Sequence, residues 1–323
     1  MCRRRETVAV IAANNGINWL ASHFATGNHL NYTNVVRINL RHLDVQSDIN
    51  ATAFPLRPTL SPRNWMMLSR SRKNFLATVR RVTENRGFDL FVPHLLLPHA
   101  MLLSLMPNCS SVTITEEGLC SHIGNDAALR KRVATRLRLM FGCGIRNLTK
   151  TTCVGQWPAT RGKSVSYLGV GETAFAWSDN REQVGLLELL KSAEEPNKVV
   201  FAMSSLSKVP MALQVQDIQT TSDALGGVPI LVSIHPSAGP KERRQIISAL
   251  SSNCSVVRGF AELELPARLA VGYGSSVLLY NAMLKSRSIS LSPVSPKWPS
   301  DFRPCIAARE KLSVAIRDCY FAD

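Results

Sequence analysis

Short apolar runs alternate with segments of helical spacing along most of this 323-residue chain. The first run, residues 7–13, has the length of a buried strand. It ends at the turn residues Asn14, Asn15 and Gly16, after which the apolar positions follow a helical period. A strand, a glycine-containing turn and a helix form the opening unit of a Rossmann-like sheet. The turn is therefore expected at the carboxyl edge of that sheet, where it can contact an acceptor, although the commoner reason for Asn and Gly is the backbone angles of the turn itself.

The rest of the first half continues this alternation. We predict a strand over 34–40, a polar loop over 42–63, a helix over 64–87 and a third strand from residue 88. The apolar stretch 90–107 is long, but it holds three prolines and two histidines, and each proline breaks the hydrogen-bond ladder of a membrane-spanning helix. We therefore expect a buried strand followed by a short core helix.

The second half repeats the pattern. A helix is predicted over 182–195, and apolar strands are predicted at 198–205, 229–236, 255–260 and 269–276, with further helices between them. Strands that alternate with helices in this way indicate a second parallel sheet.

A segment that lacks periodicity, 151–164, carries Pro158 and Gly162, and we place the interdomain linker near it. The predicted fold class is α/β, with two Rossmann-like domains that face each other across a cleft. The predicted domains are residues 1–160 and 161–323, and the C-terminal helix could pack back on the first of them.

The net charge of the chain limits the classes of partner that it is expected to bind. Lys and Arg total 38 against 23 Asp and Glu, a formal charge of +15, which favours nucleic acid, an acidic membrane surface or an acidic polymer. Aromatic residues are only 7%, and no basic-aromatic repeat or zinc-finger spacing is present, so nothing favours nucleic acid over the other two partners. Eight scattered cysteines and too few apolar residues for a signal peptide predict a cytoplasmic protein with reduced thiols.

The densest positive zone follows residue 126, where nine cations occur within 34 residues. A solvated helix face is the commoner explanation of such a run, but a polyanionic glycan or anionic lipid headgroups would also be attracted to it. We therefore expect Arg132, Arg136 and Arg138 to bind an anionic acceptor, with peripheral contact to the inner membrane face as a further role of this zone.

Two adjacent carboxylates end the strand predicted at 111–115. Glu116 and Glu117 precede Gly118, at the edge of an α/β sheet where ligands bind, so either is a candidate general base, and an acidic solvated turn is the alternative. Strand alternation places the two side chains on opposite sides, so only one can face an acceptor. We favour Glu117 as the base, since the glycine after it leaves its approach uncrowded, and expect Glu116 to brace the turn through backbone N–H groups.

Two further strand ends in the second half carry polar groups. His235 and Pro236 close one apolar strand, and Ser275 and Ser276 lie between another strand and a helix. A structural histidine and ordinary helix N-caps are the simpler explanations. An imidazole at a strand end and a helix N-terminus with hydroxyls can also hold a phosphate.

Together these elements resemble the motifs of bacterial sialyltransferases and, more closely, of the capsule-type alpha-2,8-polysialyltransferases. Glu116, Glu117 and Gly118 are similar to the acidic motif of those families, the His-Pro pair to a second motif, and the Ser-Ser pair to a third. A glutamate that contacts the nucleotide ribose in these families would be Glu262 or Glu264, and the sequence does not distinguish them.

This resemblance implies a GT-B-type, inverting and metal-independent glycosyltransferase of capsule polysaccharide synthesis that uses CMP-sialic acid and needs no cofactor. The chain has no DxD motif, and a monophosphate leaving group can be held by imidazole, hydroxyl and backbone donors. A carboxylate would take the acceptor proton while the acceptor oxygen attacks the anomeric carbon.

Three alternatives remain open at this point. The donor could be another CMP-activated acidic sugar such as Kdo. The chain could instead be a basic α/β protein that binds nucleic acid with steep salt dependence. It could also be a non-catalytic, lectin-like glycan binder.

Overall fold

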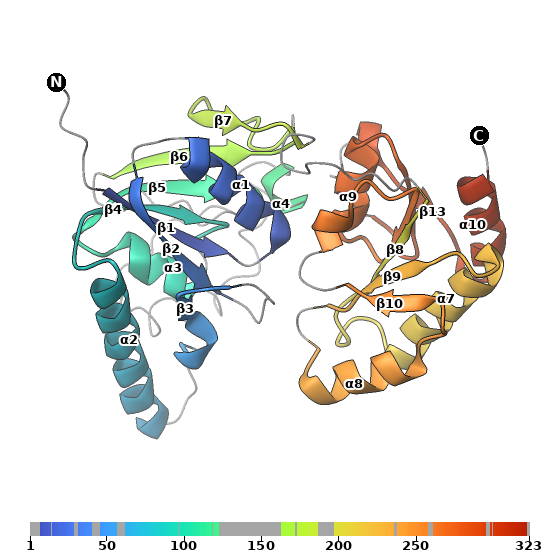
Figure 1. The fold of residues 1–323 in the computed structure, drawn as a ribbon, viewed down its shortest axis with the longest axis horizontal. Coiled ribbons are helices and arrows are strands. Elements are labelled where there is room, and N and C mark those ends of the chain that lie inside the picture. The colour runs from blue at the N-terminus through green and yellow to red at the C-terminus, as the bar shows by residue number, and fades with distance from the viewer. Residues whose placement is uncertain are drawn as a thin grey trace. The chain divides into compact units, whose positions relative to one another are not determined.

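The computed structural model describes residues 7–13, 15–28, 32–40, 46–56, 62–95, 97–117, 119–122, 163–171, 173–186, 197–235, 238–257, 261–294, 298 and 300–321. The chain divides into two compact units, Met1–Val184 and Gly185–Asp323, and each is built around one parallel sheet (Figure 1).

The sheet of the first unit has the strand order β3-β2-β1-β4-β5-β6-β7, and every neighbouring pair is parallel. Its strands are β1 (Thr7–Ala13), β2 (Tyr32–Asn39), β3 (Ile49–Asn50), β4 (Phe88–Val92), β5 (Cys109–Thr115), β6 (Ser164–Gly169) and β7 (Arg181–Gln183). Its helices include α1 (Gly16–Asn28), α2 (Pro62–Val82), α3 (Pro98–Ser104), α4 (Leu119–His122) and the short 3₁₀ helix η1 (Ala51–Ala53).

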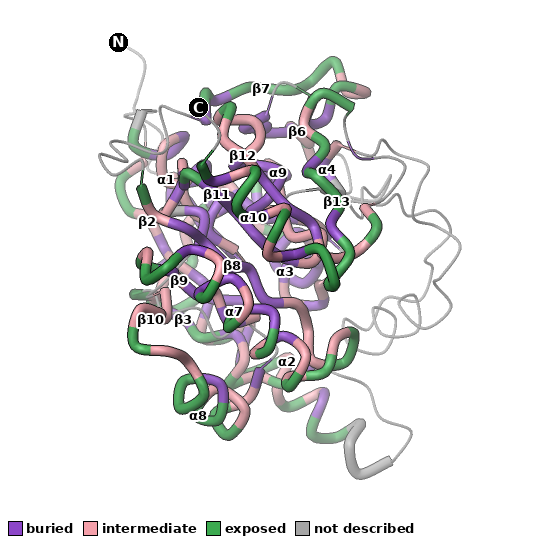
Figure 2. The backbone as a smooth tube through the Cα atoms, turned by 90° about the vertical axis from the view of Figure 1, so that its right-hand side faces the viewer, coloured by how far each residue is buried: buried purple, intermediate pink, exposed green. Residues whose placement is uncertain are grey.

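Apolar periodicity explains how this unit packs. Val8, Val10 and Ala12 alternate along β1 and share one core with Phe75 and Val79 of α2. Nearly all of β1 is buried, as expected of a central parallel strand with helices over both faces. Figure 2 shows the central strands buried and much of the helical surface exposed.

The sheet of the second unit has the order β10-β9-β8-β11-β12-β13, again entirely parallel. Its strands are β8 (Val199–Ala202), β9 (Ile230–Ser233), β10 (Cys254–Val256), β11 (Leu269–Gly272), β12 (Arg287–Ser290) and β13 (Cys305–Ile306). The helices described in this unit are α7 (Met211–Leu225), α8 (Pro240–Ala249), α9 (Ser276–Met283) and α10 (Leu312–Phe321), with the 3₁₀ turns η3 (Ala261–Glu264), η4 (Ser300–Phe302) and η5 (Arg309–Lys311).

Both sheets reverse their strand order beside the first strand of the unit. β1 lies between β2 and β4, and β8 lies between β9 and β11. In open α/β sheets, ligands bind outside the carboxyl ends of the strands at such a reversal. The predicted fold class, two Rossmann-like α/β domains, is confirmed.

Several boundaries differ from those predicted. We predicted a domain boundary near residue 160, but β6 and β7 extend the first sheet, so the division falls between Val184 and Gly185. The helix predicted over 182–195 is wrong at its start, because residues 181–183 pair with β6 as β7. The loop predicted over 42–63 contains β3 and η1 and also the first two residues of α2.

The C-terminal helix belongs to the core of the second unit. Leu312, Ile316 and Tyr320 of α10 are buried there with Ile218 of α7, and the contact of this helix with the first domain stays a prediction. Their spacing of four residues produces a single apolar stripe, and α7 covers that stripe. In the described part of the chain, no helix is long and apolar enough to cross a membrane.

Candidate active site

Three neighbouring strands of the first sheet end in polar residues that contact one another. β1, β4 and β5 are adjacent, and Asn15, His94 and Glu117 follow their carboxyl ends. The Nε2 atom of His94 lies 3.2 Å from Oε2 of Glu117, and Nδ2 of Asn15 donates a 3.1 Å hydrogen bond to the backbone oxygen of Glu117. The sheet edge therefore presents an imidazole and a carboxylate side by side.

Glu117 combines a fixed backbone with a reachable side chain. Its backbone N–H donates to Oγ of Ser121 over 3.0 Å, and its carbonyl accepts the bond from Asn15. Its carboxylate remains 19% exposed, beside a His94 side chain that is 17% exposed. A substrate hydroxyl can approach such a carboxylate, which is the geometric requirement for a general base.

Glu116 has a different environment. Its side chain is fully buried, and its Oε2 accepts the backbone N–H groups of Val170 and Gly171 at 2.6 and 2.9 Å. Nε2 of His122 donates to Oε1 over 2.8 Å, and the other nitrogen of that ring lies 2.8 Å from Oγ1 of Thr173. Glu116 therefore ties β5 to the chain that follows β6, and its buried carboxylate is placed to brace this turn.

The β1 turn provides a helix cap as well as the contact to Glu117. Oδ1 of Asn15 accepts the backbone N–H of Asn18, and Oδ1 of Asn18 accepts that of Asn15, over 3.1 and 3.4 Å. Gly16 opens α1 and is buried. The turn explanation of these residues thus holds, while the amide of Asn15 additionally positions Glu117. Asn14 and Gly118 lie outside the described residues.

His94 was not among the residues predicted from the sequence. It follows Pro93 directly after the apolar strand β4, which is the same strand-then-histidine signal that drew attention to His235. His94 lies inside the long apolar stretch that begins at residue 90, and that stretch predicts a buried core segment. Because β4 and β5 pair in register from Asp89↔Ser111 to Val92↔Ile114, His94 lies within one residue of the level of Glu117 at this edge.

The carboxyl edge of the second sheet carries the other predicted groups. His235 lies two residues beyond β9, is partly exposed, and its carbonyl accepts the N–H of Ala238 over 3.0 Å in the turn toward α8. Ser275 is the N-cap of α9, since its Oγ accepts the N–H of Val277 at 3.3 Å, and Ser276 is the first helical residue. Pro236 lies outside the described residues.

Close backbone packing shapes the loop before α9. A Cβ on Gly272 would lie 2.5 Å from the backbone oxygen of Ala202 in β8, so this position cannot accept a side chain without a shift of the neighbouring strand. Gly274 has a φ of +64°, in the left-handed region that favours glycine. The two glycines let the chain leave β11 tightly and begin α9 with its N–H groups at the sheet edge.

The two glutamates of η3 have separate environments. Glu262 is buried and hydrogen-bonded to the side chain of Ser276, and burial raises the pKa of its carboxyl group, an effect that this hydrogen bond partly offsets. Oε2 of Glu264 pairs with Nζ of Lys198, directly before β8, over 3.1 Å. Glu262 therefore lies near the start of α9 at the carboxyl edge of the sheet, whereas Glu264 lies toward the amino end of β8.

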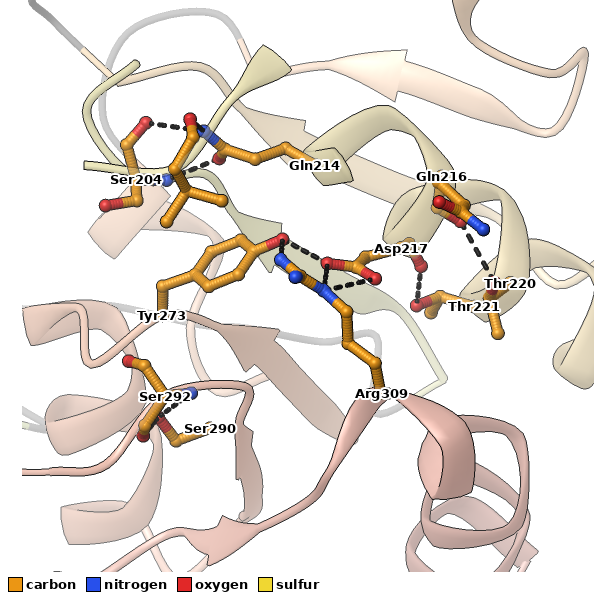
Figure 3. A network of polar contacts seen from close by, with 11 residues as sticks. Ser204, Gln214, Gln216, Asp217, Thr220, Thr221, Tyr273, Ser290, Ser292 and Arg309 are labelled. Carbon is orange, nitrogen blue, oxygen red and sulfur yellow. Dashed lines mark hydrogen bonds and ion pairs between the residues drawn. The ribbon is translucent and has the colours of Figure 1, made fainter. Parts of the chain in front are cut away.

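A polar network anchors the β11 loop to α7 (Figure 3). The hydroxyl of Tyr273 donates to Asp217, and Nε of Arg309 donates to both carboxylate oxygens of Asp217 at 3.1 and 2.9 Å. Burial raises the pKa of Tyr273, and its hydrogen bond to Asp217 adds to the effect. Nearby, the side chain of Gln214 makes two hydrogen bonds to Ser204, two residues after β8. Its Oε1 accepts the backbone N–H of Ser204 at 2.8 Å, and its Nε2 donates to the backbone oxygen of Ser204 at 3.2 Å.

The predicted acceptor-binding cations Arg132, Arg136 and Arg138 lie outside the described residues. Within the described ranges, no group of three or more His, Cys, Asp or Glu side chains is arranged to hold a metal ion.

No protein-family model and no curated protein matches this chain. Several solved structures share its fold at low sequence identity. The S. aureus MnaA–UDP co-structure is 10% identical with a TM-score of 0.54, over 98% of this chain and 88% of that one. The Methanocaldococcus jannaschii UDP-GlcNAc 2-epimerase in complex with UDP-GlcNAc and UDP is 11% identical with a TM-score of 0.54, over 98% and 93%. A variant of Os79 from O. sativa in complex with UDP is 11% identical with a TM-score of 0.50, over 98% and 91%.

These comparisons establish the fold. Its two parallel-sheet units follow the GT-B architecture shared by UDP-GlcNAc 2-epimerases and by many glycosyltransferases. Fold alone does not imply activity, because function depends on the residues at the site.

Proposed function

We propose that this protein is an inverting, metal-independent glycosyltransferase that moves sialic acid from CMP-sialic acid to a hydroxyl of an anionic glycan acceptor. The observation that supports the proposal most directly is that two adjacent acids have different environments. Glu116 is buried on backbone N–H groups, while Glu117 is partly exposed beside His94 at the carboxyl edge of the first sheet.

Glu117 would act as the general base. The acceptor oxygen forms a bond to the anomeric carbon of the donor while its proton passes to the Glu117 carboxylate. The bond between that carbon and the phosphate oxygen breaks, and its electron pair leaves with CMP. Attack from the face opposite the leaving group inverts the anomeric centre. His94 would orient the carboxylate through its 3.2 Å contact.

The second unit would hold the departing nucleotide. The imidazole of His235, the hydroxyls of Ser275 and Ser276 and the first N–H groups of α9 all lie at the carboxyl edge of the second sheet. Donors of this kind stabilise a phosphate without a divalent cation. Glu262, beside Ser276, is the better placed of the two η3 acids to accept a ribose hydroxyl.

The resemblance of these motifs to polysialyltransferases supports a sialylated acceptor and leads us to propose an acidic polymer as product. The same site would accept a donor of the Kdo type if the sugar pocket permits it. The GT-B fold is also found in enzymes that act on UDP-sugars without an acceptor, so the donor must be determined directly.

The test is to incubate the protein in EDTA with CMP-sialic acid, CMP-Kdo or UDP-GlcNAc, each with and without sialylated and galactosyl acceptors. We expect CMP release and a longer sialylated product from CMP-sialic acid only when an acceptor is present. Transfer from CMP-Kdo alone would change the donor, and turnover of UDP-GlcNAc alone would overturn the proposal. Activity that disappears in EDTA and returns with Mg²⁺ would contradict the metal-independent mechanism.

A further inference from the structure

The outer face of α2 has an unusual composition. Helix α2 contains no acidic residue, and the side chains of Arg70, Lys73, Arg80 and Arg81 are all exposed on it. Within the described part of the chain, none of these four side chains forms an ion pair. Burial of Leu68, Phe75 and Val79 against the core of the first unit fixes the opposite side of the helix, so the four cations share the solvent side.

Two large apolar side chains extend the same face. Met66 and Met67 are 72% and 62% exposed, and on a helix of 3.6 residues per turn Met66 is aligned with Arg70 and Lys73. From Met66 to Arg81 the face is about 22 Å long, at 1.5 Å per residue. In Figure 1 the amino-terminal end of α2 projects away from the sheet of the first unit. We name these six residues, Met66, Met67, Arg70, Lys73, Arg80 and Arg81, the α2 basic face.

We propose that the α2 basic face binds an anionic lipid bilayer surface. Cations arranged along a helix are attracted to anionic headgroups, and apolar side chains at one end of the row can enter the boundary between headgroups and acyl chains. A soluble polyanion would satisfy the cations but would leave the two methionines in water. The apolar pair therefore favours a membrane over nucleic acid or an acidic glycan as the partner of this face.

This inference is independent of the proposed transferase activity, because it concerns residues outside both candidate sheet edges. It also differs from the prediction for residues 126–163, which lie largely outside the described ranges. The methionines and cations belong to one helix whose buried side is defined, so substitutions on the exposed side should leave the fold intact.

The experiment is co-sedimentation of the full chain with vesicles of phosphatidylcholine alone or mixed with phosphatidylglycerol. One variant combines Arg70→Gln, Lys73→Gln, Arg80→Gln and Arg81→Gln. A matched control removes four exposed cations from the second unit through Lys208→Gln, Lys241→Gln, Arg244→Gln and Lys285→Gln. A third variant, Met66→Ser with Met67→Ser, keeps the charge. Circular dichroism and thermal unfolding verify that each variant folds.

We expect the wild-type protein to bind the mixed vesicles and not phosphatidylcholine alone. Each cation near an anionic surface changes the partition coefficient about fivefold, so the loss of all four in the α2 variant should lower vesicle binding by up to about 600-fold, and the control should lose much less. The methionine variant should weaken vesicle binding while retention on a heparin column stays unchanged. Equal losses in the α2 variant and the control would overturn the proposal, as would absence of wild-type binding. Vesicle binding that is insensitive to the methionines would also contradict the proposal, because charge alone would then account for the attraction and nothing would favour a membrane over a soluble polyanion.

Discussion

His94 lies 3.2 Å from Glu117 although the two residues belong to different strand-to-helix connections. The contact exists because β4 and β5 are parallel neighbours, and their register brings the residues that follow the two strands to within one residue of the same level. An imidazole N–H aimed at a carboxylate oxygen restricts the rotation of that carboxylate. We therefore interpret His94 as a positioning residue for the proposed base.

Substitution of His94 tests this interpretation. His94→Ala should lower kcat by up to about 10²-fold with little change in the KM for CMP-sialic acid, since misplacement of a catalytic group costs roughly that much. His94→Gln, which can still donate to Oε2 of Glu117, should recover much of the loss. Steady-state kinetics of both variants provide the measurement. If the Gln variant were as slow as the Ala variant while both fold normally, hydrogen-bonded positioning would not be the role of this histidine.

Substitution by glutamine should affect a different property at each of the two adjacent acids, transfer at Glu117 and stability at Glu116. Glu117→Gln cannot accept a proton, so transfer should fall by roughly 10² to 10⁴ while unfolding is little affected. Glu116→Gln weakens a fully buried set of hydrogen bonds to Val170, Gly171 and His122 and should destabilise the protein by about 1–3 kcal/mol. Urea unfolding and CMP release measured on both variants decide the matter. An active Glu117→Gln protein beside a stable but inactive Glu116→Gln protein would exchange the two roles.

The positions of these groups were predictable because strand ends could be read from apolar runs. The runs predicted at 7–13, from residue 88 and at 111–115 correspond to β1, β4 and β5. Polar residues directly after a buried parallel strand lie at the sheet's carboxyl edge. The alternation of side chains along a strand also predicted that Glu116 and Glu117 point to opposite sides. The hydrogen-bond partners of Glu116 could not be predicted from the sequence. Val170 and Gly171 follow it by 54 and 55 residues, and no local sequence pattern indicates that β6 pairs with β5.

Other differences from the prediction have equally local causes. β7 is an edge strand whose three residues are all exposed, so it has no apolar pattern by which to recognise it, and the domain boundary was placed too early. Glu262 and Glu264 are two residues apart in a 3₁₀ turn, and only the packing of η3 shows which one is buried. The apolar stripe of α10 identified a packed helix but carried no information about which core it joins.

The burial of the Glu262 carboxyl group leads to a prediction about how stability depends on pH. Burial raises its pKa above the ordinary value of 4.5, so the folded state favours the neutral acid. A group with a raised folded-state pKa contributes its full stability below the unfolded pKa, and that contribution is lost as the pH rises through the folded pKa. Glu262→Gln mimics the neutral acid at every pH. It should therefore gain stability relative to the wild-type protein as the pH increases above about 4.5.

Urea unfolding from acidic to mildly alkaline pH measures this difference. The control is Glu264→Gln, which removes a neighbouring carboxyl group that is 30% exposed and paired with Lys198. A difference between Glu262→Gln and wild type that stays constant with pH would mean that the Glu262 carboxyl group titrates alike in the folded and unfolded states.

The final prediction concerns how α7 holds the loop before α9. The Asp217 side chain is 5% exposed and accepts from Tyr273 and Arg309, whereas the Arg309 side chain is 39% exposed, so solvent screens much of the ion pair and the phenol contact should carry more of the energy. Asp217→Asn keeps the shape but weakens both bonds, and we expect a loss of about 1–3 kcal/mol, with a smaller loss for Arg309→Gln. Because Tyr273 is two residues before Ser275, a loosened loop should also move the α9 N-terminus and weaken CMP binding. Unfolding and CMP titrations on Asp217→Asn, Tyr273→Phe and the double variant separate the pairwise energy from the single effects. If stability falls while CMP affinity is unchanged, the network supports only the core of the second unit, and the N-terminus of α9 is positioned by Gly272 and Gly274 alone.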